Sequence, residues 1–72
     1  MTFDSKSLKL VRVLRGVSQR DLAQRVGSGC NELQISRFET GRRQPSPETI
    51  AKLAAALDCA PSDLMDEDRD AE

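Results

Sequence analysis

The sequence predicts an all-α protein, a compact bundle of five short helices. The chain has 72 residues, which is enough for one domain around one core. Hydrophobic residues make up 38% of it and aromatic residues only 3%, so that core must be small and aliphatic. The apolar residues recur at helical spacing, and we find no alternation typical of a strand.

The first helix is predicted at residues 5–15. We expect one apolar side facing the core, made by residues at helical spacing: Leu8, Leu10, Val11, Leu14 and Val17. Gly16 follows the last turn and ends the helix.

A second helix begins after Ser18. The Ser18 hydroxyl can accept a hydrogen bond from a free backbone N–H, and Asp21 complements the helix dipole. Gly27 ends this helix. Its inward side consists of Leu22, Ala23 and Val26.

A third helix is predicted at residues 32–40. Asn31 can cap it, Gln34 can complete a capping box, and Cys30 can pack against Ile35. Gly41 ends the helix, and an exposed basic loop follows.

The fourth helix opens at Ser46, with Pro47 in its first helical position. Its buried stripe consists of Ile50, Leu53, Ala54 and Leu57. A short fifth helix should follow Pro61, at residues 62–65. We therefore assign residues 1–65 to one domain and residues 66–72 to an acidic tail, which we expect to fray because no large apolar side chain anchors it.

Composition limits the function classes. No apolar run approaches the length of a membrane span or follows charges at the N-terminus, so we expect a cytoplasmic protein without a membrane partner. The chain has no histidine, and Cys30 and Cys59 lack metal-site spacing, so we expect no metal, no cofactor and no catalytic residue. We interpret both cysteines as reduced and largely buried, with a disulfide between chains or a redox role for Cys30 as the alternative.

The charges are segregated along the chain. Residues 1–43 hold nine cations against four acids, a net charge of +5, whereas residues 44–72 hold two cations against eight acids, a net charge of −6. A basic half that forms one surface can neutralise phosphates, although a solvated surface of mixed charge is the plainer interpretation.

Two short helices joined by a glycine-containing turn form the unit that inserts a helix into the DNA major groove. Residues 6–65 resemble the Xre and phage-repressor family of lambda-repressor-like, five-helix DNA-binding domains. The resemblance rests on four segments: Leu8-x-x-Val11-Arg12-x-x-Arg15-Gly16-Val17-Ser18-Gln19, Asp21-Leu22-Ala23-x-x-Val26-Gly27, Ile35-Ser36-Arg37-Phe38-Glu39-x-Gly41-Arg42-Arg43-x-Pro45-Ser46 and Ile50-x-x-Leu53-Ala54-x-x-Leu57. One departure is a turn before the third helix that is about two residues longer than is usual in the family. We place the added Ser28 and Gly29 in the turn, and a helix starting near Ser28 is the alternative.

The resemblance implies which residues read DNA bases. Glu32, Leu33 and Arg37 would face base edges, and Arg37 is the strongest candidate because its planar fork can bind guanine bidentately. Gln34 would either cap the helix or join them. The alternatives are a dipole role for Glu32, packing on the turn for Leu33 and a surface ion pair for Arg37.

The resemblance also implies contacts to phosphate and one structural pair. Gln19 would contact phosphate and brace the third helix. The full phosphate-contacting set is Ser18, Gln19, Thr40, Arg42 and Arg43. Arg12 and Glu39 would form a structural ion pair that fixes the third helix against the first.

These expectations describe a transcription regulator that binds double-stranded DNA as a homodimer on a roughly palindromic operator. At this length we expect no small-molecule ligand. Pro61, Leu64 and Met65 would form the dimer interface, with closure of the monomer core as the alternative for Leu64 and Met65. A second interpretation is an antitoxin whose acidic C-terminal part binds a partner protein. We consider an enzyme the weakest class, because no nucleophile has an evident base beside it.

Overall fold

The computed structural model describes residues 2–27 and 30–66. Within these residues the chain forms four α-helices, one 3₁₀ helix and two short strands. In chain order they are β1 (Thr2–Phe3), α1 (Ser5–Leu14), α2 (Gln19–Val26), α3 (Glu32–Thr40), α4 (Pro47–Ala56), η1 (Pro61–Leu64) and β2 (Met65–Asp66). The predicted fold is therefore right for the four α-helices and wrong in its count of five.

The fifth helix is a single 3₁₀ turn. The Asp63 carboxylate accepts from the Ala60 N–H at 3.1 Å, which closes the start of the turn. At Met65 the backbone becomes extended, with φ −118° and ψ 155°, because this residue pairs with the N-terminal strand. The helix predicted at residues 62–65 therefore ends at Leu64.

A two-stranded antiparallel sheet joins the two ends of the domain. Thr2 pairs with Asp66 and Phe3 with Met65, and the Asp4 N–H donates to the Leu64 carbonyl at 2.9 Å. The expectation of no strands was wrong, because strands of two residues are too short to show alternation. Asp66, which we assigned to the tail, belongs to β2, and residues 67–72 lie outside the described part of the chain.

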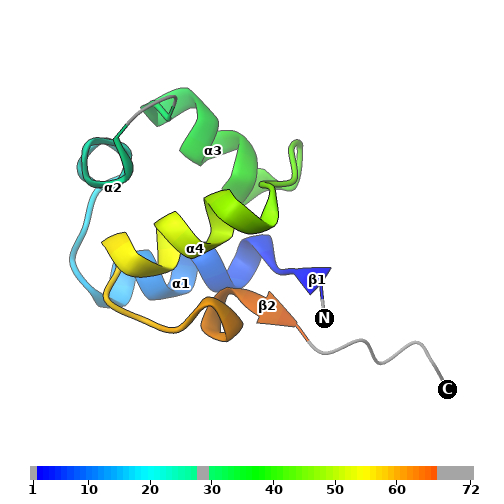
Figure 1. Ribbon diagram of the computed structural model, residues 1–72. Helices are drawn as coiled ribbons and strands as arrows, with labels where there is room; N and C mark the ends of the chain where they lie inside the picture. The colour runs from blue at the N-terminus through cyan, green and yellow to red at the C-terminus, as the bar shows by residue number, and fades with distance from the viewer. Residues whose placement is uncertain (1, 28–29, 67–72) are drawn as a thin grey trace, which may run out of the picture.

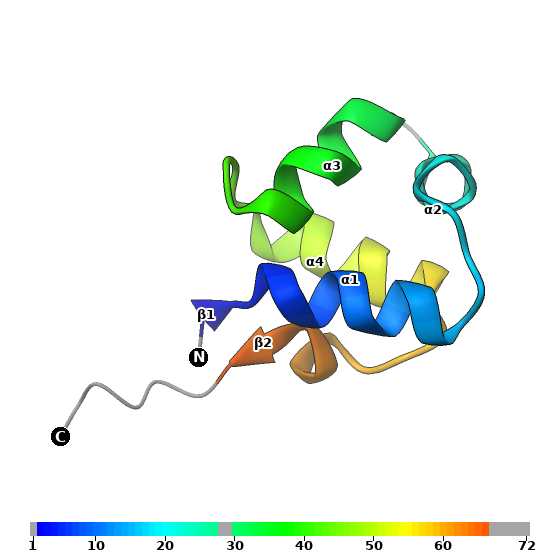
Figure 2. The same ribbon diagram turned by 180° about the vertical axis from the view of Figure 1, so that it is seen from behind.

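The elements form three groups around one core. In both views α2 and α3 lie together on one side of α1 and α4, and the sheet and η1 lie on the opposite side (Figures 1 and 2). Residues of α1, α2, α3, α4 and η1 contribute to the core. The buried residues of the core are Leu8, Val17, Leu22, Ala23, Ile35, Phe38, Ile50, Leu53, Ala54, Leu57 and Leu64. None of the helices in residues 2–27 and 30–66 is long and apolar enough to cross a membrane.

The apolar side of α1 is narrower than predicted. Leu8 is fully buried and Val11 partly buried, but Leu10 and Leu14 are 59% and 74% exposed. A helix turns once in about 3.6 residues, which places these two leucines on the side opposite Leu8. The expectation that they face the core was therefore wrong.

Candidate DNA interface

Side-chain caps fix where α2 and α3 begin. The Ser18 hydroxyl accepts from the Asp21 N–H at 3.0 Å, and the Asn31 side-chain oxygen accepts from the Gln34 N–H at 2.9 Å. Cys30 and Asn31 therefore precede α3, which supports the shorter helix over one that starts near Ser28. The free N–H groups in the first turn of a helix are donors that a phosphate can bind.

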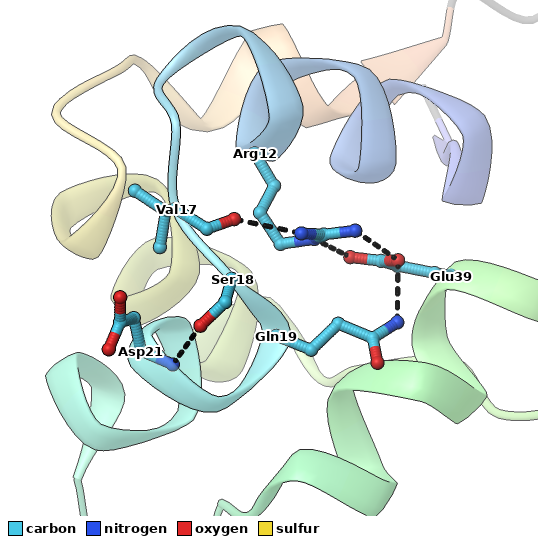
Figure 3. Close-up of polar contacts among 6 residues, drawn as sticks. All are labelled: Arg12, Val17, Ser18, Gln19, Asp21 and Glu39. Atoms are coloured by element: carbon cyan, nitrogen blue, oxygen red, sulfur yellow. Dashed lines mark hydrogen bonds and ion pairs between the residues drawn. The ribbon is translucent and has the colours of Figure 1, made fainter.

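A buried ion pair ties α1 to the end of α3 (Figure 3). The Arg12 Nε lies 2.5 Å from the Glu39 Oε2, and the Arg12 Nη2 lies 3.3 Å from the Glu39 Oε1. Only 11% of the Arg12 side chain and 3% of the Glu39 side chain are exposed. The sequence-based expectation of a structural pair matches this geometry.

Two further bonds extend the pair into a network. The Gln19 side-chain amide donates to the Glu39 Oε1 at 3.0 Å, and the Arg12 Nη1 donates to the Val17 carbonyl at 2.8 Å. Figure 3 shows these groups converging from α1, the loop after it, the start of α2 and the end of α3. The network therefore ties α1, the start of α2 and the end of α3 together.

The outer side of α3 presents the expected base-reading side chains. Glu32, Leu33 and Arg37 are all exposed, and Leu33 is 56% exposed despite being apolar. The opposite side of α3 carries Ile35 and Phe38, which are buried in the core. On such a surface the leucine can contact a thymine methyl, the glutamate can accept from a cytosine amino group, and the arginine can bind guanine.

Gln34 lies on the inner side of α3. It is half-buried and lines a cavity of about 280 Å³ together with Cys30 and Phe38. Its side-chain oxygen is buried and has no hydrogen-bond partner among the described residues. Because Gln34 is one turn before Phe38, it shares the side of the helix that faces the core. Gln34 therefore lies apart from the exposed Glu32, Leu33 and Arg37, and its place in the base-reading set stays a prediction.

Four of the five expected phosphate-contacting side chains are exposed, and the fifth, Gln19, already has a hydrogen-bond partner within the fold. Ser18, Thr40, Arg42 and Arg43 are exposed, although Arg43 also lines the cavity beside Gln34. Gly41 ends α3 with φ +79°, a left-handed conformation that glycine adopts freely, and this turn carries both arginines beyond the helix. The Gln19 side-chain amide donates to Glu39. This contact braces α3, which is one of the two roles expected for Gln19, the other being a phosphate contact.

Three cations of the basic half are committed within the fold. Arg12 pairs with Glu39, while Arg15 and Arg25 donate to the carbonyls of Asp58 and Ala56 near the end of α4, at 3.1 and 3.3 Å. The basic residues that remain for a ligand are exposed, and they are Lys6, Lys9, Arg20, Arg37, Arg42 and Arg43. The basic half is therefore only partly available to phosphates.

Comparison with known proteins decides the family. A family model described as Helix-turn-helix matches residues 8–64. The chain belongs to the helix-turn-helix family. This match confirms the resemblance to Xre-type and phage-repressor proteins, and it makes the chain a DNA-binding transcription regulator. No curated protein sequence matches this regulator at a significant level.

Three solved structures are similar to this helix-turn-helix protein. The restriction-modification controller protein C.AhdI from Aeromonas hydrophila is 34% identical over 85% of this chain and 86% of its own, with a TM-score of 0.79. The P22 c2 repressor, solved in complex with synthetic operator 9T, is 25% identical over 94% of this chain and 100% of its own, with a TM-score of 0.78. A hypothetical transcription factor, NHTF, from Neisseria is 30% identical over 93% of this chain and 75% of its own, with a TM-score of 0.78.

The helix-turn-helix protein has a second surface region at η1. Leu64 was expected in a dimer interface, but it is fully buried in the core of the single chain, so the alternative of closing that core applies to it. Pro61 is exposed and Met65 half-buried. Both line a shallow apolar groove of about 260 Å³, whose other walls are Pro47, Ile50 and Ser62.

Both cysteines, Cys30 and Cys59, are free thiols and half-buried. Burial raises the pKa of the Cys30 thiol and that of the Cys59 thiol, where the nearby Asp63 carboxylate acts in the same direction. A raised pKa disfavours the thiolate, which is the reactive form of cysteine. Residues 2–27 and 30–66 contain no cluster of side chains that could hold a metal ion.

Sequence reasoning missed two parts of the site. Nothing in the spacing indicated the bond from Arg12 to the Val17 carbonyl, because it depends on the path of the loop after Gly16. The bond between Gln19 and Glu39 had a signal, since a bracing role for this glutamine was already implied, but its partner was not.

Proposed function

We propose that this protein is a sequence-specific transcription regulator that reads its operator through the outer side of α3. The observation that carries the proposal is the exposed set Glu32, Leu33 and Arg37 on a helix whose far end is held by a buried ion pair. A rigidly held helix presents the same side chains in the same register at every encounter, and base discrimination requires this.

Phosphate contacts would set the position of that helix on the duplex. The start of α2 lies against the end of α3, where Gln19 bonds Glu39, and the turn with Arg42 and Arg43 follows that same end. Contacts from these groups hold the register without reading sequence. The P22 c2 repressor, solved with a synthetic operator, supports DNA as the ligand.

The proposed functional unit is a homodimer on an approximately palindromic operator. One domain of this size covers little DNA surface, so useful specificity needs two half-sites. Two-fold symmetry would place the two α3 helices in successive major grooves, roughly 34 Å apart. The apolar groove beside Pro61 and Met65 supports this, because it lies between α4 and η1 and includes none of the proposed base-reading residues.

The likeness to a restriction-modification controller protein supports a regulator over the antitoxin interpretation. A regulator that binds its operator as a dimer would respond to its own concentration, because only dimers reach full affinity. Dimerisation is then the switch.

Selection of bound sites from a random DNA pool tests the proposal. We expect enrichment of a sequence with two related half-sites whose centres are about 10 base pairs apart, or a multiple of this. Recovery of unrelated sequences with equal affinity would contradict sequence-specific binding.

A further inference from the structure

The outer face of α1, defined by Leu10, Val13 and Leu14, is apolar and exposed. These three side chains are 59%, 57% and 74% exposed, and among the described residues they are three of the four exposed large apolar side chains. They are spaced by three and four residues, so they form one contiguous stripe on the helix. A clustered apolar stripe on a small soluble domain marks an interaction site more often than scattered single residues do.

This face is separate from the parts of the molecule already assigned. Leu8 and Arg12 lie on the inner side of α1, where Leu8 enters the core and Arg12 meets Glu39. The fourth exposed apolar residue, Leu33, belongs to the outer side of α3. The outer face of α1 therefore serves neither the core nor the base-reading helix, and it does not line the groove beside Met65.

The charges carried by α1 itself have one sign. Helix α1 contains no acidic residue, and its exposed cations, Lys6 and Lys9, lie within a turn of Leu10. Arg15, at the other end of the stripe, adds a third exposed cation, whose side chain donates to the Asp58 carbonyl. A complementary partner therefore presents apolar side chains flanked by carboxylates.

Two possible occupants fit this surface poorly. A second copy using the same face would bring its cations Lys6, Lys9 and Arg15 toward the cations of the first, and like charges across an interface disfavour it. The acidic C-terminal sequence of the chain has suitable charge, but residues 67–72 include no large apolar side chain to cover the stripe.

We infer that the outer face of α1 is a docking surface for an acidic amphipathic helix of another protein. Leucine-type side chains of that helix would pack on Leu10, Val13 and Leu14, and its glutamates or aspartates would face Lys6 and Lys9. The surface is small, so the contact is weak and transient by itself. Because it lies apart from the outer side of α3, such a partner can bind while α3 occupies DNA.

A synthetic peptide tests the inference on the full chain. The probe is an acidic amphipathic helix about 15 residues long, built from leucine and glutamate, and the control peptide has lysine in place of every glutamate. We expect amide shift changes in NMR spectra to concentrate on residues 6–14. Binding should weaken with salt, and the lysine peptide should not bind.

Matched variants separate this face from general hydrophobic binding. Changing Leu10, Val13 and Leu14 together to glutamine keeps good helix formers at exposed positions, and it should weaken peptide binding at least about tenfold while leaving DNA affinity unchanged. Leu33→Gln alters an equally exposed leucine on α3 and should leave peptide binding intact.

Other outcomes would overturn the inference. These are equal binding of both peptides, no binding of the acidic peptide, or unaltered binding by the triple glutamine variant. Self-association that the triple variant abolishes would instead assign the face to a second copy. Binding to vesicles containing phosphatidylserine, without binding to the acidic peptide, would assign it to a membrane surface.

Discussion

At the scale of single residues, Glu39 has the largest structural role that we can assign. It is almost completely buried, and it accepts from both Arg12 and Gln19. A buried carboxylate is stable only when such donors replace water. Removing one partner therefore costs more stability than the intact pair contributes. The network thus secures orientation rather than adding much net stability.

We predict strong coupling between Arg12 and Glu39. Arg12→Ala leaves the buried Glu39 carboxylate with Gln19 as its one remaining side-chain donor among those described, and Glu39→Ala leaves a buried guanidinium, so each change should cost roughly 3 to 5 kcal/mol of unfolding free energy. The double change should cost much less than the sum, because neither charge is then orphaned. Denaturant melts of the four proteins measure this coupling.

Arg15→Ala provides the matched control. Arg15 lies at the end of the same helix, but it is exposed and bonds only a carbonyl, so its loss should cost about 1 kcal/mol or less. Additive losses for Arg12 and Glu39, or an equally large loss for Arg15, would show that the buried pair is not what holds α3.

At the scale of elements, the start of α3 determines which side chains reach DNA. Asn31→Ala removes the cap and should lower stability by about 1 kcal/mol. The first turn should fray, so specificity should fall where Glu32 and Leu33 contact bases and persist where Arg37 does. Binding to operators with single base changes measures this difference.

Ser46→Ala is the control for the cap. Ser46 caps α4 through the Thr49 N–H at 3.2 Å, in the same way that Asn31 caps α3. It should lower stability by a similar amount and leave the pattern of base preference unchanged. If Ser46→Ala altered base preference as Asn31→Ala does, the effect would come from lost stability and not from the start of α3.

The helices could be predicted because their ends are encoded locally. Ser18, Asn31, Ser46 and Gly41 act within one turn of the chain, and each occupies the expected cap position. The β1–β2 sheet could not be predicted, because it depends on residues more than sixty positions apart in the chain. The same pairing ends η1 at Leu64.

The exposed residues of the candidate site could be predicted from the sequence, but the orientation of others could not. Glu32, Leu33 and Arg37 occur on the exposed side of α3, as the resemblance implied. Gln34 could not be oriented from a capping pattern alone, because that pattern also fits an inward side chain next to Phe38. Leu10 and Leu14 were misplaced because an apolar residue is compatible with a docking surface as well as a core.

At the scale of the whole molecule, the two halves of the chain carry opposite net charges. The acidic half keeps the net charge at −1 while the exposed cations of the other half remain free to meet phosphates. We therefore expect operator affinity to fall steeply with salt.

We predict that Met65→Asp weakens dimerisation and operator binding together, because it places a charge in the apolar groove beside Pro61. Sedimentation with and without operator measures both. Met65 also pairs with Phe3, so Ser62→Glu, at an exposed position on the same groove, is the second variant that avoids the sheet. Saturated one-to-one complexes on a palindrome, with no dimer at any step, would contradict a dimeric unit.

The central claim is that the outer side of α3 reads bases while the turn after it holds phosphate. Competition binding of two variants across all single base-pair changes in the selected operator tests this claim most directly. Arg37→Ala should relax preference at one base pair at a cost of roughly 1 to 3 kcal/mol, whereas Arg42→Ala should weaken every sequence about equally and flatten the salt slope by about one unit. If Arg37→Ala kept the full preference of the unaltered protein at every position, α3 would not read DNA in the register described.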